Sequence, residues 1–121
     1  MSGFINFKLE NGSLVTVSKT AIVYIQENAT NSERVHIHLV AGVSHIIQGK
    51  YDDIRKQFPK FIDVKLQSEP ENKKSSVAVH DYNTSYLEKT PNGTTIFFVE
   101  RGAGIQVRES YETLSAKFHA I

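Results

Sequence analysis

Three histidines carry the most distinctive chemistry in this sequence. His36 and His38 alternate with apolar residues, and His45 follows after Ala41 and Gly42. Side chains two residues apart on a strand lie on one face, and a two-residue turn at Ala41 and Gly42 would place His45 opposite His38. Three imidazoles together could bind zinc and leave one coordination position open. Because no carboxylate or cysteine nearby completes the set, a histidine face that is pH-sensitive or that contacts a partner is the preferred interpretation.

No other set of residues predicts catalysis. The sequence contains no cysteine, which excludes disulfides and a thiolate nucleophile. It has no Gly-x-Ser-x-Gly motif, and nothing in it places a base beside a nucleophile. Gly102 and Gly104 lack the longer phosphate-binding pattern and the helix that would follow it, so they indicate a hairpin turn. We therefore expect a protein that is not an enzyme and uses no cofactor.

The segments that position these residues occur twice in the chain. Four correspondences follow in the same order: residues 4–9 with 61–66, Tyr24 with Tyr86, Gly42 with Gly102, and residues 51–58 with 111–118. A unit of about sixty residues is small for an independent core. We therefore expect a single domain, residues 1–121, in which the internal repeats 1–60 and 61–121 share one core and are related by pseudo-two-fold symmetry.

Each repeat is predicted to be an antiparallel β-meander followed by a short helix, which makes the fold class mainly β (α+β). Asn11 and Gly12 are typical of a tight hairpin turn, Pro59 should end the first helix, and Ser110 should cap the second. The predicted strands are residues 4–9, 14–17, 21–26, 34–40, 43–48, 61–66, 77–79, 85–88, 94–100 and 105–107, and the helices are residues 49–58 and a segment from about 109. Residues 67–76 are polar and predict a long surface loop.

The apolar positions of these segments predict the core. Alternating positions on the strands and helically spaced positions near Phe58 and Phe118 should be buried. The predicted core residues are Phe7, Val17, Ile25, Ile37, Leu39, Ile54, Phe58, Val64, Val79, Leu87, Ile96 or Phe97, Val107, Leu114 and Phe118.

Composition limits the partners. The 14 basic and 13 acidic residues give a formal net charge of +1, so affinity for nucleic acid requires a local patch. No apolar run is long enough to span a bilayer and no leader is evident, so we expect no membrane contact and a cytoplasmic location. Basic residues that could contact phosphates and aromatic residues that could stack on bases are Lys8, Lys65, Lys73, Lys74, Arg101, Arg108, Tyr24, Tyr82 and Tyr86.

Three family resemblances bear on function. Residues 87–91 and 95–98, with Gly102 and residues 105–110, resemble the small FlbD-like proteins of flagellar and swarming operons. Residues 22–25, 35–39 and 58–62, with Gly42, resemble the LytTR DNA-binding domain of response regulators, although Asp63, Val64 and Lys65 stand where that family has a His-Arg-Ser segment. Four strands and a helix, given twice, are similar to the strand order of the PC4, Whirly and PUR single-strand-binding proteins.

Two of these resemblances imply nucleic acid, so we expect a small non-catalytic binding or regulatory protein that favours single-stranded nucleic acid. Single strands should bind better than duplex, and binding should weaken steeply with salt. The alternative is a protein–protein interaction or structural accessory protein, including a homo-oligomer, as the FlbD-like resemblance would imply. A third interpretation is a metal- or small-ligand-binding module that uses the histidine face.

Overall fold

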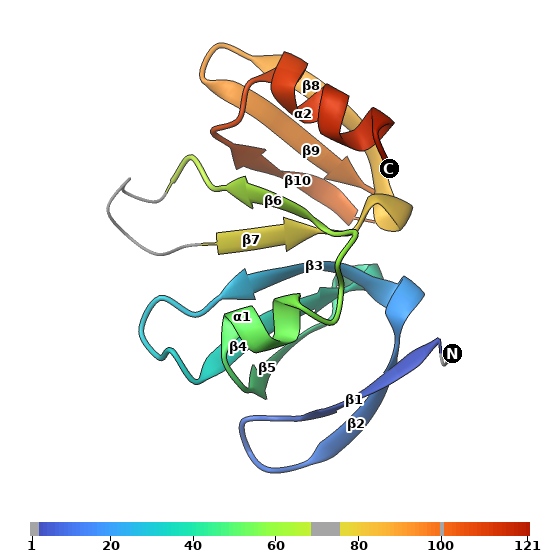
Figure 1. The fold of residues 1–121 in the computed structure, drawn as a ribbon, viewed down its shortest axis with the longest axis vertical. Helices are drawn as coiled ribbons and strands as arrows, with labels where there is room; N and C mark the ends of the chain where they lie inside the picture. Colours follow the sequence, from blue (N-terminus) through green and yellow to red (C-terminus); the bar gives the residue numbers. More distant parts are fainter. Residues whose placement is uncertain (1–2, 69–75, 100) are drawn as a thin grey trace.

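The computed structural model describes residues 3–68, 76–99 and 101–121, and it has the predicted class: mainly β, with antiparallel strands and two short helices (Figure 1). The first half contains β1 (Phe4–Lys8), β2 (Leu14–Ser18), the 3₁₀ turn η1 (Lys19–Ala21), β3 (Ile22–Glu27), β4 (Arg34–Leu39), the 3₁₀ turn η2 (Val40–Gly42), β5 (Ser44–Gln48) and α1 (Tyr51–Arg55). The second half contains β6 (Ile62–Lys65), β7 (Ser76–Val79), the 3₁₀ turn η3 (Asp81–Asn83), β8 (Thr84–Thr90), β9 (Gly93–Phe98), β10 (Arg101–Val107) and α2 (Tyr111–His119).

One central sheet contains strands from both halves. Its order is β5-β4-β3-β7-β6, and β3 of the first half pairs with β7 of the second. The remaining strands form the hairpin β1-β2 and the sheet β10-β9-β8. Single bridges, Leu9 to Ile47 and Leu66 to Val107, connect these outer pieces to the two edges of the central sheet. The strands therefore follow one another from β2 at one end of the molecule to β8 at the other (Figure 1).

Local sequence explains most element boundaries. A turn lies at the predicted Asn-Gly pair, where Gly12 has a φ of 92° and the Ser13 N–H donates to Asn11 Oδ1 over 2.9 Å. It is longer than the predicted tight turn, because the Leu9 N–H donates to the Ser13 carbonyl and leaves residues 10–12 between them. Ser110 caps α2 by accepting a hydrogen bond from the Thr113 N–H. The prediction of a turn at Gly102 and Gly104 is wrong, because both glycines lie within β10.

The first helix is shorter than predicted. Residues 49–58 were expected to be helical, but α1 spans only Tyr51–Arg55. Gly49 has a φ of 130°, outside the helical region, which excludes it from the helix. After Arg55 the chain continues in turns that carry Phe58 into the core.

The apolar side chains form two clusters, so the prediction of one shared core is wrong. One cluster gathers residues of β1–β5 and α1 with Phe61 and Ala78, and the other gathers residues of β6–β10 and α2 with Val23. Ala78 lies between Val77 and Val79 on β7, and the alternation of side chains sends it to the cluster of the first half. Each cluster therefore includes side chains from both halves of the chain.

Burial follows the predicted pattern closely. Most of the predicted core residues are buried, while four of them, Leu39, Leu87, Phe97 and Phe118, are half-buried. Residues that the prediction omitted but that are also buried include Ile22, Val23, Val35, Ile47, Phe61, Ile62, Val77, Ala78 and Phe98.

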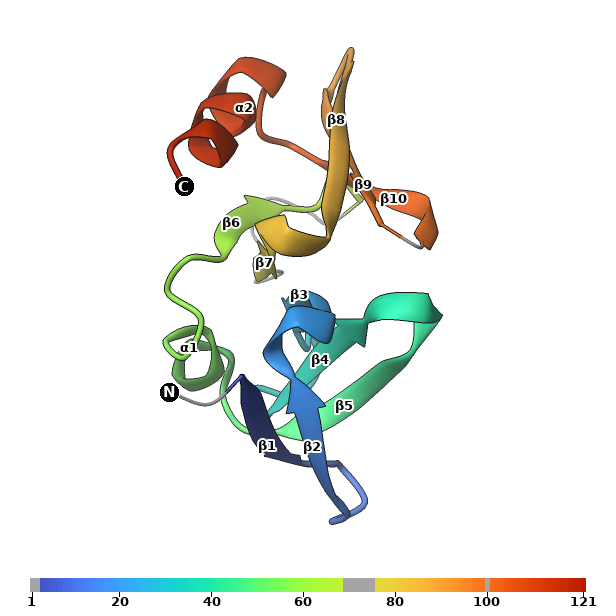
Figure 2. The ribbon, with the colours of Figure 1, turned by 90° about the vertical axis from the view of Figure 1, so that its right-hand side faces the viewer.

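Both helices lie on one side of the molecule (Figure 2). No helix in the described ranges is long and apolar enough to cross a membrane.

Arg55 fixes the path of the chain between the two halves. Its guanidinium donates to the carbonyl oxygens of Phe58 and Phe61, the latter over 2.6 Å. It also binds both carboxylate oxygens of Asp63, at 2.8 and 3.2 Å. A planar fork with several donors can satisfy all these acceptors at once, whereas an ammonium group cannot. Arg55 therefore ties α1 to the start of β6.

We expect Arg55→Lys to lower the free energy of unfolding by about 2 kcal/mol, because hydrogen bonds from a charged group to partly buried carbonyls are lost. Urea denaturation measures this loss. Arg34→Lys is the matched control, since the Arg34 guanidinium makes one hydrogen bond, to the Glu33 carbonyl, and an ion pair at 3.5 Å with exposed Glu10. Equal losses in the two variants would contradict the special role of Arg55.

A second prediction compares Phe58, which follows α1, with Phe118 on α2. Phe58 is 5% exposed and its ring stacks on Phe61 at 4.8 Å, so Phe58→Ala should cost about 3–5 kcal/mol of stability. Phe118 on α2 is only half-buried, and Phe118→Ala should cost clearly less. Chemical denaturation of both variants tests this order, and a larger loss at Phe118 would overturn it.

Candidate ligand-binding site

The three histidines do not share one face. His38 lies opposite Ser44, whereas His45 lies opposite Ile37, which is fully buried. Cross-strand partners lie on the same face, so His45 belongs to the face of Ile37 and not to that of His36 and His38. The prediction that His45 faces His38 is therefore wrong.

The length of the turn causes this change. The turn uses the three residues of η2, with Ala41 at φ 62° and Gly42 at φ 77°, and the Leu39 N–H donates to the Val43 carbonyl over 2.7 Å. A turn of two residues would have paired His45 with His38, and one extra residue shifts the register by one position. Within the described part of the chain, no group of three or more His, Asp or Glu side chains is placed to hold a metal ion.

His36 and His38 instead begin a row of stacked rings. The His38 ring stacks on Tyr24 with centroids 4.1 Å apart, and Tyr24 stacks on Phe98 at 5.4 Å. His36 lies 6.3 Å from His38, with its plane turned by 16°. We call these four residues the ring row. It runs from the first half of the chain, on β4 and β3, to the second half, on β9.

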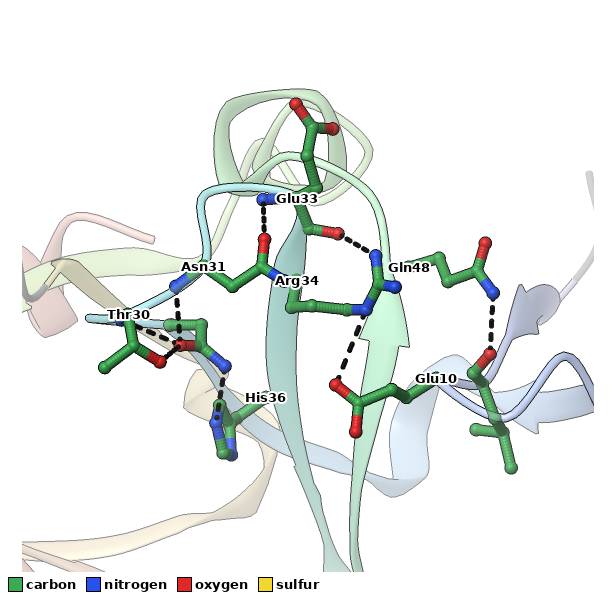
Figure 3. Close-up of polar contacts among 9 residues, drawn as sticks. Glu10, Thr30, Asn31, Glu33, Arg34, His36 and Gln48 are labelled. Carbon is green, nitrogen blue, oxygen red and sulfur yellow. Dashed lines mark hydrogen bonds and ion pairs between the residues drawn. The ribbon is translucent and has the colours of Figure 1, made fainter.

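Polar contacts hold the two histidines in place. The His38 Nε2 lies 3.1 Å from Gln26 Oε1, and the His36 Nε2 lies 3.3 Å from Asn28 Nδ2. Asn28 in turn accepts hydrogen bonds from the loop before β4, at the backbone N–H groups of Thr30 and Asn31 (Figure 3). The ring row is thus fixed at its outer end by a loop that the sequence had not marked as important.

A pocket of about 400 Å³ lies at the other end of the ring row. Tyr24 and Phe98 line it, and its other walls come from two glycine-bearing segments, Ala41 and Gly42 in the turn and residues 102–105 of β10. We call it the glycine pocket. Its volume falls in the range of about 300–1,000 Å³ that is usual for small-ligand sites.

The β10 wall of the glycine pocket has an irregular backbone. Arg101 pairs with Phe98 and Ile105 pairs with Ile96, and the register shifts between these two pairs. The peptide groups of residues 102–104 therefore lie in a bulge, outside the regular ladder. Gly104 must be a glycine, because a Cβ there would approach the Ile96 carbonyl oxygen to 2.4 Å. A bulge leaves its extra residue unpaired in the ladder.

The residues expected to contact nucleic acid are spread over separate elements. Lys8 lies exposed on β1, and Lys65 lies exposed on β6, where its Nζ is 3.3 Å from Ser76 Oγ. Arg108 follows β10 and donates to the Leu66 carbonyl over 3.1 Å. Lys73, Lys74 and the side chain of Arg101 lie outside the described part of the structure. The described basic residues do not gather around the glycine pocket.

The expected aromatic contacts also separate. Tyr24 belongs to the ring row, whereas Tyr82 is 67% exposed on η3 near His80. Tyr86 is 54% exposed on β8, where its ring stacks on Phe97 at 4.4 Å. Of the three tyrosines, Tyr24 alone lines the glycine pocket.

A second pocket of about 400 Å³ lies between α1, β6 and α2. The hydroxyl of Tyr51 is buried there with no hydrogen-bond partner, and burial, with the nearby Asp63 carboxylate, raises the pKa of this phenol far above its usual value. The charged residues in its lining are evenly divided: Arg55, Lys65 and Lys117 against Asp52, Asp63 and Glu109. This balance favours neither an anion nor a cation.

Sequence reasoning found Tyr24 and His38 but missed Phe98, Ala41 and the β10 bulge as parts of the site. The correspondence of Gly42 with Gly102 was the available signal, because these two glycines line the same pocket. No family model, curated protein or solved structure matches the chain, so the three family resemblances stay predictions.

We expect His45 to contribute nothing to metal affinity. His45→Ala should leave a calorimetric zinc titration unchanged from wild type, because its ring lies on the face opposite His36 and His38. His38→Ala is the comparison variant. If wild type binds zinc with micromolar affinity and both substitutions abolish the signal, the assignment of His45 to the other face is wrong.

Proposed function

We propose that this protein is a non-catalytic binding protein whose glycine pocket accepts an unpaired base of a single-stranded nucleic acid. The observation that carries this proposal is the position of the pocket, at the end of a row of stacked rings and beside the bulge in β10. A flat heteroaromatic ring matches both features, because it can pack against aromatic side chains and form hydrogen bonds along its edge.

Packing against rings supplies the affinity. A base in the pocket would pack against the half-buried Tyr24 ring and touch the small exposed part of Phe98, which is 4% exposed. Such stacking contributes about 1–3 kcal/mol for each base and tolerates any base identity. The bulge at residues 102–104 would supply hydrogen bonds to the base edge from peptide N–H and C=O groups.

Electrostatics limits this mode of binding. Lys65 and Arg108 lie side by side, since the Arg108 N–H donates to the Lys65 carbonyl over 2.8 Å, whereas Lys8 lies far from them on β1, so few phosphates would be neutralised together. The dependence of affinity on salt grows with the number of phosphates contacted. We therefore expect a shallow salt dependence in place of the steep one predicted from the sequence, and a short strand as the natural ligand.

We also propose that the chain arose by tandem duplication. The Gln48 side chain donates to the Leu9 carbonyl over 3.1 Å, and at the corresponding place Arg108 donates to the Leu66 carbonyl over 3.1 Å. Likewise the Glu10 N–H donates to the Ile46 carbonyl, and the Gln67 N–H donates to the Gln106 carbonyl. These paired contacts, with the same element order in both halves, support a duplicated unit.

A pseudo-two-fold axis does not fit this proposal. A two-fold axis exchanges β3 with β8 and β7 with β2, so it would require β2 to pair with β8 as β7 pairs with β3. Among the described residues, β3 pairs with β7, but β2 does not pair with β8. A head-to-tail arrangement of two similar units agrees with the observed pairing.

The cytoplasmic location expected from the sequence stays a prediction.

Gly102→Val should block the glycine pocket without disturbing the fold. A Cβ at Gly102 meets nothing within 4 Å, and valine is favourable in a strand. We expect the affinity for a short single-stranded oligonucleotide to fall by about tenfold or more, which corresponds to the loss of at least about 1.4 kcal/mol of stacking. Fluorescence anisotropy at low ionic strength measures this change.

Gly3→Val is the matched control, because a Cβ there also meets nothing within 4 Å and Gly3 lies outside the pocket. It should bind like wild type, and a duplex of the same sequence should bind more weakly than the single strand. Competition by free nucleosides would show that the base alone is sufficient. Absence of binding to oligonucleotide and nucleoside, or equal loss in both variants, would refute the proposal.

A further inference from the structure

Two strands at opposite ends of the molecule have an open edge. Among the described residues, β2 pairs with β1 alone and β8 pairs with β9 alone. These strands carry two of the most exposed large apolar side chains, Leu14 on β2 at 78% and Tyr86 on β8 at 54%. An open edge presents unpaired peptide groups to another strand.

The strands that correspond to these two in the other half are joined to each other. Tyr24 on β3 corresponds to Tyr86 on β8, and Val79 on β7 corresponds to Val17 on β2. In the central sheet, β3 pairs with β7 through three residue pairs: Tyr24 with Val79, Ile25 with Ala78, and Gln26 with Val77. The internal junction thus joins β3 and β7, and the strands that correspond to them, β8 and β2, are the ones with an open edge at the ends of the molecule.

We propose that β8 of one molecule pairs with β2 of a second copy of this chain, in the register of the internal β3–β7 junction. The expected residue pairs are Tyr86 with Val17, Leu87 with Thr16, and Glu88 with Val15. The inference rests on the correspondence between the halves and is independent of nucleobase binding.

Burial at the central pair of residues supports this register. Ile25 and Ala78 are both 0% exposed where β3 meets β7. Their counterparts are less buried: Leu87 is half-buried and Thr16 is exposed. A second copy would cover Leu87 with Thr16 just as Ala78 covers Ile25, and apolar surface would leave water.

Most side chains along the two edges are compatible with this pairing, and the one charged residue in the expected pairs is Glu88, at the place that Gln26 takes in the internal junction. The β2 sequence, Leu-Val-Thr-Val-Ser, has none of the charges or prolines that usually protect an edge strand. On β8, Lys89 is directed toward α2, where its Nζ lies 2.7 Å from Glu112 Oε1. A charged side chain is thus held away from the edge.

The contact between copies should be weaker than the internal junction. Inside the molecule, the Asn83 amide donates to the carbonyls of Thr20 and Ile22, at 2.7 and 2.9 Å. In the first half, the residue that corresponds to Asn83 is Ala21, which has no side-chain amide. We therefore expect reversible association. Since the two edges differ, the contact is head-to-tail and leaves an open edge at each end, so assemblies can grow beyond a dimer.

Sedimentation velocity over a range of protein concentrations tests association. The mean mass of wild type should rise with concentration and pass that of a dimer. Thr16→Lys places a charge at the centre of the contact and should keep the protein monomeric. Asn6→Ala is the control, because it removes the same hydrogen bond, from Thr16 Oγ1 to Asn6 Oδ1, without adding charge, and it should associate like wild type.

Disulfide cross-linking tests the register, and the absence of native cysteine gives a clean background. A mixture of the Thr16→Cys and Leu87→Cys chains should form a mixed dimer under mild oxidation. The matched mixture of Thr16→Cys with Glu88→Cys should not, because residue 88 points to the opposite face. Monomeric wild type at millimolar concentration, or equal cross-linking in the two mixtures, would overturn the proposal.

Discussion

The pairing of β3 with β7 is the constraint on which the rest of the structure depends. It places three residues of the first half against three of the second, and it creates the only sheet in the described structure that contains strands from both halves. Because side chains alternate along each strand, Ala78 packs into one cluster while Val77 and Val79 pack into the other. A slip of one residue at this junction would exchange these faces and expose both clusters.

The candidate site follows from the same pairing. With β3 beside β7, Tyr24 comes within stacking distance of Phe98, and the turn after β4 comes beside β10. Neither half alone contains the glycine pocket, since Ala41 and Gly42 line it from one half and Gly102 to Ile105 from the other. The pocket is in this sense a product of the contact between the two halves.

Sequence patterns predicted the elements well and the relations between them less well. Alternation identified buried strand residues such as Ile25, Ile37 and Val107, because the alternating residues on one face of a strand pack into the same cluster. The Asn-Gly turn and the Ser110 cap were also predictable, since both depend on neighbouring residues alone. The face of His45 was not, because it depends on whether Val40 belongs to the strand or to the turn. The glycine pocket was not predicted, because its walls meet only through long-range pairing and the correspondence of Gly42 with Gly102 does not show that the two glycines lie together.

Differences between the corresponding positions show how similar units can acquire separate roles. His36 and His38 correspond to Ile96 and Phe98, which are buried in the second half, while the histidines stay half-buried and polar. Phe98 is buried at the inner end of the ring row, and His36 lies at the outer end, where Asn28 contacts it. The same comparison underlies the proposed association between copies: β3 and β7 pair with each other inside the chain, whereas β8 and β2 each have one neighbouring strand among the described residues. A head-to-tail junction between two units always leaves one edge of each kind open, and closure of that edge requires a further molecule.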